Sequence, residues 1–138
     1  MAPDGATQVV LDDLLWPNGV GFAPDGETLY VAEYAAARVR AVGPRGSSVF
    51  AAAPRGECDG LAVDAEGGVW VALGSGGGIA RFDAVGALRE VVELPGRFVS
   101  SLAFAGTAIY VTTVGALLRI DVGVPGLAVP AAIIPVRG

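Results

Sequence analysis

The sequence predicts an all-β fold made of β-propeller blades, with about three four-stranded antiparallel sheets. A strand-turn-strand pattern occurs three times, at residues 18–32, 59–72 and 100–112. The polar residues that open the three copies, Asn18, Asp59 and Ser100, are spaced 41 residues apart. A fixed period in the low forties with this content is typical of propeller blades. The 21 glycines and 9 prolines also fit short strands and tight turns.

The length of the chain limits how much of a propeller it can form. Its 138 residues suggest one domain, and three periods account for most of them. Closed propellers have about four to eight blades, so three blades form only part of a ring. We expect a partial propeller over residues 7–138, with blades near 18–58, 59–99 and 100–138, after a disordered N-terminus of residues 1–6.

In the first blade, each predicted strand is separated from the next by turn residues. An outer strand at Gln8–Leu11 is expected to begin the array. The turn Pro24-Asp25-Gly26 has strong turn chemistry and separates the two inner strands. The four strands of this blade are predicted at Val20–Ala23, Thr28–Ala32, Arg38–Val42 and Ser48–Ala52.

The second and third blades follow the same order. The second is predicted to contain strands at Leu61–Val63, Val69–Ala72, Ile79–Asp83 and Leu88–Leu94. The third is predicted at Leu102–Phe104, Ile109–Thr113 and Leu117–Asp121, with Ala131–Val136 as the only candidate for a fourth strand. The inner strands are continuous apolar runs, which indicates sheets buried on both faces.

Charge and composition exclude several classes of function. The net charge of −5 and the absence of a basic run argue against nucleic-acid and anionic membrane partners. Because histidine is absent, Ser-His and Cys-His nucleophiles are excluded, and any metal must be held mainly by oxygen.

The cysteine content and hydropathy suggest a compartment and a tendency to associate. Cys58 is the only cysteine, and its acidic neighbours argue against a reactive thiol. The N-terminus shows no signal-peptide pattern, so a cytoplasmic location is expected. Mean hydropathy is high, at +0.59, and an open array leaves inter-blade faces bare. Self-association through those faces is therefore possible.

Asn18 and Asp59 are the candidate metal-binding residues. Each begins the innermost strand of its blade, and these strand starts surround the channel of a propeller, so the two side chains could converge. Amide and carboxylate oxygens are ligands for hard divalent cations. Alternatively, Asn18-Gly19 and Asp59-Gly60 only make turns. Ser100, at the same position in the third blade, either bonds a ligand or ends a loop.

Other polar and aromatic residues are given structural roles. Glu33 is expected to be a solvated surface carboxylate. Asp25, Asp64 and Glu66 are assigned to turns. The aromatic residues expected to fill the core between blades are Trp16, Tyr30, Trp70 and Tyr110.

Several of these segments together resemble the regucalcin/gluconolactonase/luciferin-regenerating enzyme family. They are Pro17-Asn18-Gly19, residues 22–32 (FAPDGETLYVA), residues 59–72 (DGLAVDAEGGVWVA), residues 117–122 (LLRIDV) and Gly126-Leu127. The resemblance covers nearly the whole chain but only the C-terminal half of the family. It implies a six-bladed propeller that binds one divalent metal, Ca, Zn, Mn or Mg, at the mouth of its channel. It also implies hydrolysis of sugar lactones.

The same resemblance assigns roles to two residues. Asn18 matches the family's metal-binding Asn, and Asp59 matches its metal-binding Asp, which is also the proposed general base. The family's ligand Glu belongs to N-terminal blades that this chain does not match. Two functions therefore stay open: a divalent-metal-dependent lactonase that acts on a small-molecule lactone, and a non-catalytic half-propeller that serves only for assembly or binding.

Overall fold

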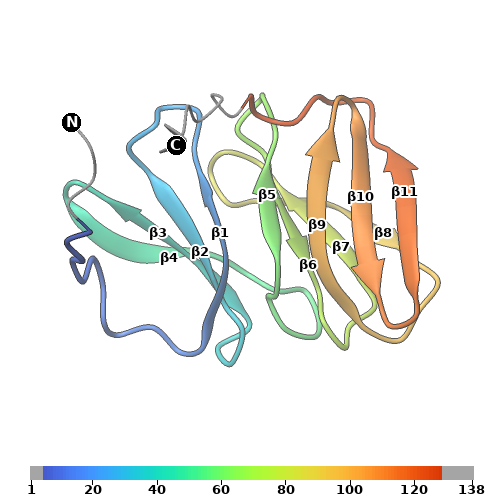
Figure 1. Ribbon diagram of the computed structural model, residues 1–138, viewed down its shortest axis with the longest axis horizontal. Coiled ribbons are helices and arrows are strands. Elements are labelled where there is room, and N and C mark those ends of the chain that lie inside the picture. Colours follow the sequence, from blue (N-terminus) through green and yellow to red (C-terminus); the bar gives the residue numbers. More distant parts are fainter. Residues whose placement is uncertain (1–4, 129–138) are drawn as a thin grey trace, which may run out of the picture.

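The computed structural model describes residues 5–128, which form three antiparallel β-sheets (Figure 1). The first and second sheets have four strands, and the third has three. No helix occurs among residues 5–128, and so this part of the chain has none that could cross a membrane. The all-β prediction is confirmed, and each sheet corresponds to one copy of the 41-residue repeat.

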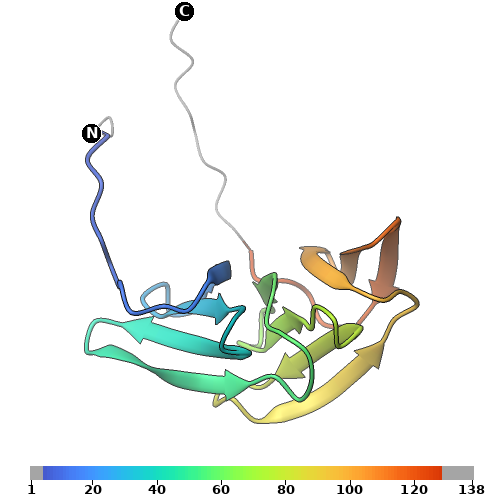
Figure 2. The ribbon, with the colours of Figure 1, turned by 90° about the horizontal axis from the view of Figure 1, so that it is seen from below.

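The strands pair in chain order within each sheet. The first sheet comprises β1 (Pro17–Phe22), β2 (Leu29–Glu33), β3 (Arg38–Gly43) and β4 (Gly46–Ala52). The second comprises β5 (Leu61–Val63), β6 (Val69–Ala72), β7 (Gly78–Phe82) and β8 (Leu88–Glu93). The third comprises β9 (Val99–Ala105), β10 (Ala108–Thr113) and β11 (Ala116–Asp121). Figure 2 shows the sheets side by side along an arc, with β4 and β8 on the side opposite β1 and β5.

The second sheet is buried on both faces, and β6 shows how. Val69 and Val71 belong to the apolar core between the first and second sheets. Trp70 and Ala72 belong to the core between the second and third sheets. None of the four is more than 1% exposed. Successive strand residues point to opposite faces, so a continuous apolar run supplies both cores, as the sequence indicates.

The predicted turn between β1 and β2 is organised by one exposed carboxylate. Asp25 accepts hydrogen bonds from the backbone N–H groups of Glu27 and Thr28 and from the Thr28 hydroxyl, each at 2.8 Å. These bonds favour the charged form and hold the pKa of Asp25 below its ordinary value. Its assignment to a turn is confirmed.

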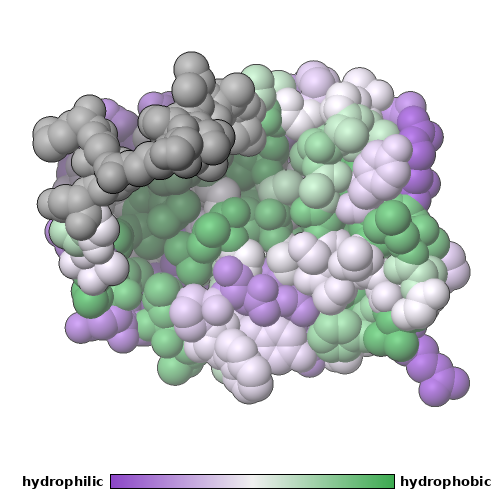
Figure 3. All heavy atoms as spheres, in the orientation of Figure 1, coloured by the Kyte–Doolittle hydropathy of each residue, from purple (hydrophilic) through white to green (hydrophobic). Residues whose placement is uncertain are grey.

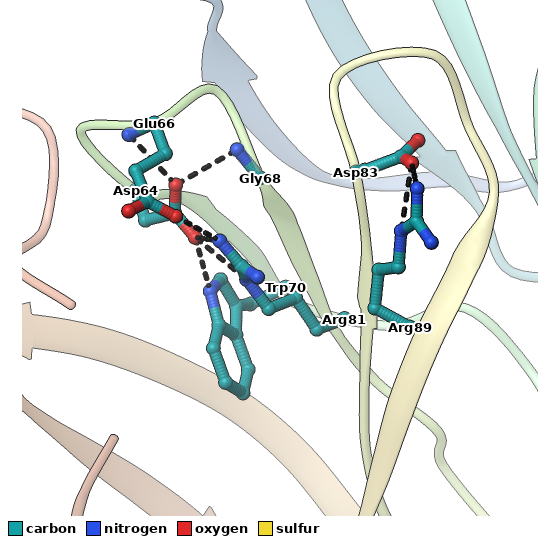
Figure 4. Close-up of polar contacts among 7 residues, drawn as sticks. All are labelled: Asp64, Glu66, Gly68, Trp70, Arg81, Asp83 and Arg89. Carbon is teal, nitrogen blue, oxygen red and sulfur yellow. Dashed lines mark hydrogen bonds and ion pairs between the residues drawn. The ribbon is translucent and has the colours of Figure 1, made fainter. Parts of the chain in front are cut away.

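Asp64 also lies in a turn, but it is fully buried and connects three parts of the second blade (Figure 4). Its carboxylate accepts hydrogen bonds from the backbone of Glu66 at 2.9 Å and of Gly68 at 2.8 Å. It also accepts bonds from Trp70 Nε1 and Arg81 Nε, both at 2.9 Å. Because it holds the turn, β6 and β7 together, Asp64 stabilises the blade as well as shaping its turn.

Two predicted outer strands have different outcomes. The prediction of a strand at Gln8–Leu11 is wrong. These residues are not in a sheet, and Val9 and Val10 are 75% and 72% exposed. A strand needs a neighbour to pair with, and no strand among residues 5–128 pairs with this segment. The candidate fourth strand of the third blade, Ala131–Val136, lies outside the described residues.

The aromatic prediction is half right. Trp70 and Tyr30 are 1% and 5% exposed and lie in the two cores. Trp16 and Tyr110, by contrast, are 69% and 40% exposed. Trp16 precedes β1, and Tyr110 lies on the face of the third sheet that no other sheet of residues 5–128 covers, so neither is enclosed between these sheets.

The expectation that Glu33 is a solvated carboxylate is wrong. Glu33 is the last residue of β2 and is fully buried. It pairs across the sheet with Arg38, whose Nε donates to Glu33 Oε2 at 2.5 Å. The backbone N–H of Leu15 donates to Glu33 Oε1 at 2.9 Å, which ties the N-terminal segment to the sheet. A buried carboxylate is stable only when it is paired in this way.

Replacing Glu33 by Gln is expected to lower stability most at neutral pH. The hydrogen bond from Arg38 is the main reason why the pKa of Glu33 is below its ordinary value, outweighing the effect of burial. A lowered pKa contributes stability above the unfolded-state pKa, and that stability is lost as pH falls through the folded-state pKa. Urea unfolding of both proteins from pH 7 to pH 3 should show their stabilities converging in acid; a constant difference would contradict this.

The inner strands line a shallow apolar groove of about 520 Å³. Its wall includes Val20 from β1, Leu61 and Val63 from β5, and Leu102 and Phe104 from β9. Figure 3 shows apolar side chains gathered across this face of the molecule. The groove lies where the channel of a propeller would run, so the inner strands form part of a channel wall.

Candidate metal and catalytic site

The three repeated polar residues lie at the same end of the inner strands. Asn18 is the second residue of β1, Ser100 is the second residue of β9, and Asp59 lies two residues before β5. In Figure 1, β1, β5 and β9 run side by side in the same direction, so these residues share one edge. Asp64, at the other end of β5, lies away from this edge.

Backbone hydrogen bonds between sheets hold this edge together. The Gly19 N–H donates to the Asp59 carbonyl oxygen at 3.0 Å, and the Gly60 N–H donates to that of Ser100 at 2.9 Å. The same bond therefore recurs one repeat later. It brings the backbones of residues 19 and 59, and of residues 60 and 100, next to each other.

The glycines of the Asn-Gly and Asp-Gly pairs are needed for this close approach. A Cβ at Gly19 would lie 2.7 Å from the Asp59 carbonyl oxygen, and one at Gly60 would lie 2.7 Å from Ser101 Cα. Neither glycine has a positive φ, and neither pair forms a turn. The interpretation of these pairs as turns is therefore wrong, because the missing side chain makes room for the neighbouring blade.

Asp59 is a buried carboxylate without a counter-charge. It is 7% exposed, yet within residues 5–128 its carboxylate has neither an ion pair nor a hydrogen-bond donor. Burial, and secondly the charge of Glu57, raise its pKa above the ordinary value. The other two buried carboxylates, Glu33 and Asp64, are both fully paired. Within residues 5–128 neither carboxylate oxygen of Asp59 is an enclosed atom without a partner, so both oxygens reach solvent and are open to a ligand.

Glu57 is a neighbour of this site that the sequence-based prediction missed. Both of its carboxylate oxygens are held by Ser75: the backbone N–H donates to Oε2 at 2.7 Å, and the hydroxyl donates to Oε1 at 2.9 Å. Glu57 and Asp59 are two residues apart, and the charge of Glu57 contributes to the raised pKa of Asp59. In the sequence, the two-residue spacing between Glu57 and Asp59 is the signal that could have identified Glu57.

Asn18 and Ser100 differ in how free they are to bind a ligand. Asn18 is exposed, and within residues 5–128 its side-chain amide has no hydrogen bond. Ser100 Oγ lies 2.9 Å from Thr112 Oγ1 and is bonded within its own sheet. The described part of the chain has no group of three or more Cys, Asp or Glu side chains that could hold a metal. The edge therefore offers an amide oxygen and a carboxylate.

Cys58, next to Asp59, takes no part in this chemistry. It is fully buried, and burial raises the pKa of its thiol to about 12. A thiol with so high a pKa is neither a nucleophile nor a metal ligand near neutral pH. The prediction that Cys58 is an ordinary small residue agrees with this environment.

Three known proteins show what this chain is similar to. The pentonolactonase XacC of Haloferax volcanii is 34% identical in an alignment of 124 positions, and the match covers 81% of this chain and 43% of that protein. The Xanthomonas campestris gluconolactonase is 30% identical with a TM-score of 0.75, over 92% of this chain and 43% of that one. The calcium-binding regucalcin of Agrobacterium tumefaciens is 29% identical with a TM-score of 0.68, over 75% of this chain and 39% of that one.

These comparisons define both the fold and its extent. The chain spans less than half of the length of the relatives it matches. Its three sheets are blades of a partial β-propeller of the six-bladed kind found in gluconolactonases. Residues 1–115 match the family described as the SMP-30/Gluconolactonase/LRE-like region, and the chain belongs to this family.

Proposed function

We propose that this chain provides part of the site of a divalent-metal-dependent sugar-lactone hydrolase. In this proposal Asn18 and Asp59 are metal ligands, and Asp59 is also the general base. The observation that carries the proposal is the unpaired, buried carboxylate of Asp59 at the mouth of the channel wall. Membership of the gluconolactonase family supports the same reaction.

The donor set fits a hard cation. Asn18 provides an amide oxygen and Asp59 a carboxylate, the oxygen ligands that Ca²⁺, Mg²⁺ and Mn²⁺ prefer and that Zn²⁺ also accepts. A bound divalent ion supplies Lewis-acid polarisation of the ester carbonyl. A cation beside Asp59 would also supply the counter-charge that this carboxylate lacks within residues 5–128. Ca, Zn, Mn and Mg therefore all remain candidates, with one ion per complete propeller.

In this proposal Asp59 moves a proton during ring opening. Water adds to the lactone carbonyl carbon and gives up a proton to the Asp59 carboxylate. The bond from that carbon to the ring oxygen then breaks, and the departing oxygen takes the proton, so that one hydroxy acid forms. The raised pKa of Asp59 makes its carboxylate a stronger base, which favours acceptance of the proton from water.

The chain alone is expected to be a poor enzyme. A calcium site takes six to eight oxygens, and two side chains supply only some of them. The ligand Glu that the family resemblance implies does not belong to the blades present here. Metal binding by this chain should therefore be weak, and lactone hydrolysis low or absent.

The test of the function is acid release from gluconolactone and pentonolactones, followed with a pH indicator. Any hydrolysis above the spontaneous rate should rise with added Ca²⁺, Mn²⁺ or Zn²⁺ and should vanish in Asp59→Asn. The matched control is Glu90→Gln, which neutralises an exposed carboxylate on the outer strand β8. Hydrolysis that persists in EDTA or in Asp59→Asn would contradict the proposal.

A second function, assembly without catalysis, is favoured by two uncovered sheet faces. Val20 and Phe22 of the first sheet are 59% and 55% exposed, and Leu117 of the third sheet is 67% exposed. Burying these residues against another copy would remove apolar surface from water. Light scattering should then show oligomers that dissociate in a Phe22→Ser, Leu117→Ser variant; a monodisperse native monomer would contradict this function.

We place either function in the cytoplasm and expect neither nucleic-acid nor membrane partners. The single free thiol, Cys58, is compatible with a reducing compartment. The net charge of −5 opposes binding to nucleic acid and to anionic lipid.

A further inference from the structure

Trp16 is an exposed aromatic residue in an unusual backbone conformation beside the candidate site. Its φ is 56°, in the left-handed region that a bulky side chain rarely adopts. It is 69% exposed and lies two residues before Asn18. Strained backbone that persists is concentrated at binding and catalytic sites, so Trp16 is a candidate for a ligand contact.

The backbone and the ring of Trp16 are both held in place. The Tyr34 N–H donates to the Trp16 carbonyl oxygen at 3.0 Å, and the Ala35 N–H donates to that of Leu15 at 3.3 Å. The Trp16 and Tyr34 rings lie 5.4 Å apart between centroids, with their planes tilted by 46°. The two rings in contact form an apolar surface, and each side chain has only two torsions to fix on binding.

This aromatic surface lies at the same edge of the first sheet as Asn18. Tyr34 follows Glu33, which pairs across the sheet with Pro17, the residue between Trp16 and Asn18. Trp16 is joined to Asn18 through Pro17 alone. The aromatic pair thus lies beside the edge that carries the Asn18 amide and the Asp59 carboxylate.

We propose that Trp16 and Tyr34 form an aromatic platform that binds the C–H face of a sugar-lactone ring. A cyclic sugar has a face of C–H bonds and a rim of hydroxyl groups, which suits a platform bordered by polar oxygens. The platform selects closed rings over open chains, because only the ring offers a flat apolar face. This inference rests on the proposed function and names the substrate class that the site prefers.

The test is calorimetric titration with gluconolactam, a cyclic analogue whose amide does not hydrolyse. Trp16→Ala is expected to weaken binding about tenfold, and Trp16→Phe, which keeps a ring, to weaken it by about threefold. The control Tyr110→Ala removes an exposed aromatic from the free face of the third sheet and should change nothing. Glucitol, the open-chain polyol, should bind much more weakly than gluconolactam to the native protein.

A fluorescence measurement on the native protein provides an independent readout. The chain has two tryptophans, and Trp70 is only 1% exposed, so acrylamide quenching reports mainly on Trp16. Gluconolactam should protect Trp16 from quenching, and glucitol should not. Unchanged near-ultraviolet dichroism of buried Trp70 in Trp16→Ala will show that the variant folds.

The outcomes separate the platform from the proposed function. Calcium titration of Trp16→Ala should match the native protein, because Asn18 and Asp59 remain. The platform is overturned if native protein binds no gluconolactam, or if Trp16→Ala binds it as tightly as the native protein does. If Trp16→Ala loses lactam affinity but Asp59→Asn leaves metal binding unchanged, the platform stands and the proposed function fails.

Discussion

Asp64→Ala is expected to remove most of the stability of the second blade, although Asp64 lies in a turn. The substitution leaves the Trp70 indole N–H without its acceptor and removes one of two carboxylates from Arg81 (Figure 4). Breaking a buried, hydrogen-bonded ion pair costs about 3–5 kcal/mol, a large share of the stability of a domain of this size. Urea unfolding followed by Trp70 fluorescence measures the loss.

Asp25→Ala is the matched control for this prediction. Asp25 also accepts three hydrogen bonds in a turn, but all three are exposed to water, so its loss should be much smaller. Equal losses of stability in Asp25→Ala and Asp64→Ala would mean that burial of the Asp64 network contributes nothing.

Gly60→Ala is expected to force the second and third blades apart. The new methyl group would lie 2.7 Å from Ser101 Cα, a backbone atom that cannot move by a change of rotamer. We expect a loss of about 3 kcal/mol or more, at the upper end of the range for overpacked sites. Thermal unfolding gives the size of the effect.

Gly43→Ala provides the control, because Gly43 lies in strand β3 with space around it. A methyl group at this position would have Thr28 Oγ1 as its nearest neighbour, at 4.0 Å, and the φ of Gly43 is not positive. This variant should be as stable as the native protein. If Gly60→Ala is tolerated as well as Gly43→Ala, the close approach of the blades at residue 60 is not required.

The sequence predicts the fold well because the repeat and the apolar runs are local signals. The 41-residue spacing defines the three sheets, and the continuous run Val69–Ala72 indicates a strand with two buried faces. Gln8–Leu11 has strand-like composition, but pairing depends on a neighbouring strand that composition does not reveal. Local sequence patterns therefore predict which segments form blades more reliably than they predict the outer strands of those blades.

The candidate site could be predicted in position but not in environment. The spacing places Asn18 and Asp59 on one edge, as the hydrogen bond from Gly19 to Asp59 requires. Whether a carboxylate is paired depends on the strand register: Glu33 meets Arg38 only because β2 and β3 align those two residues. Asp59 has the same charge, but in the described chain no cation reaches it. The sequence does not reveal that Asp59 lacks a cationic partner within residues 5–128.

The central claim, that Asp59 is a metal ligand, is tested most directly by thermal unfolding with and without millimolar Ca²⁺, Mn²⁺ or Zn²⁺. Burial and the charge of Glu57 disfavour the ionised form of Asp59, so Asp59→Asn should unfold at a higher temperature than the native protein without metal. One of these cations should raise the native Tm, as binding to the folded state requires, and should leave that of Asp59→Asn unchanged. Glu90→Gln should respond as the native protein does. An equal metal response in native protein and Asp59→Asn, or none in either, would contradict the claim.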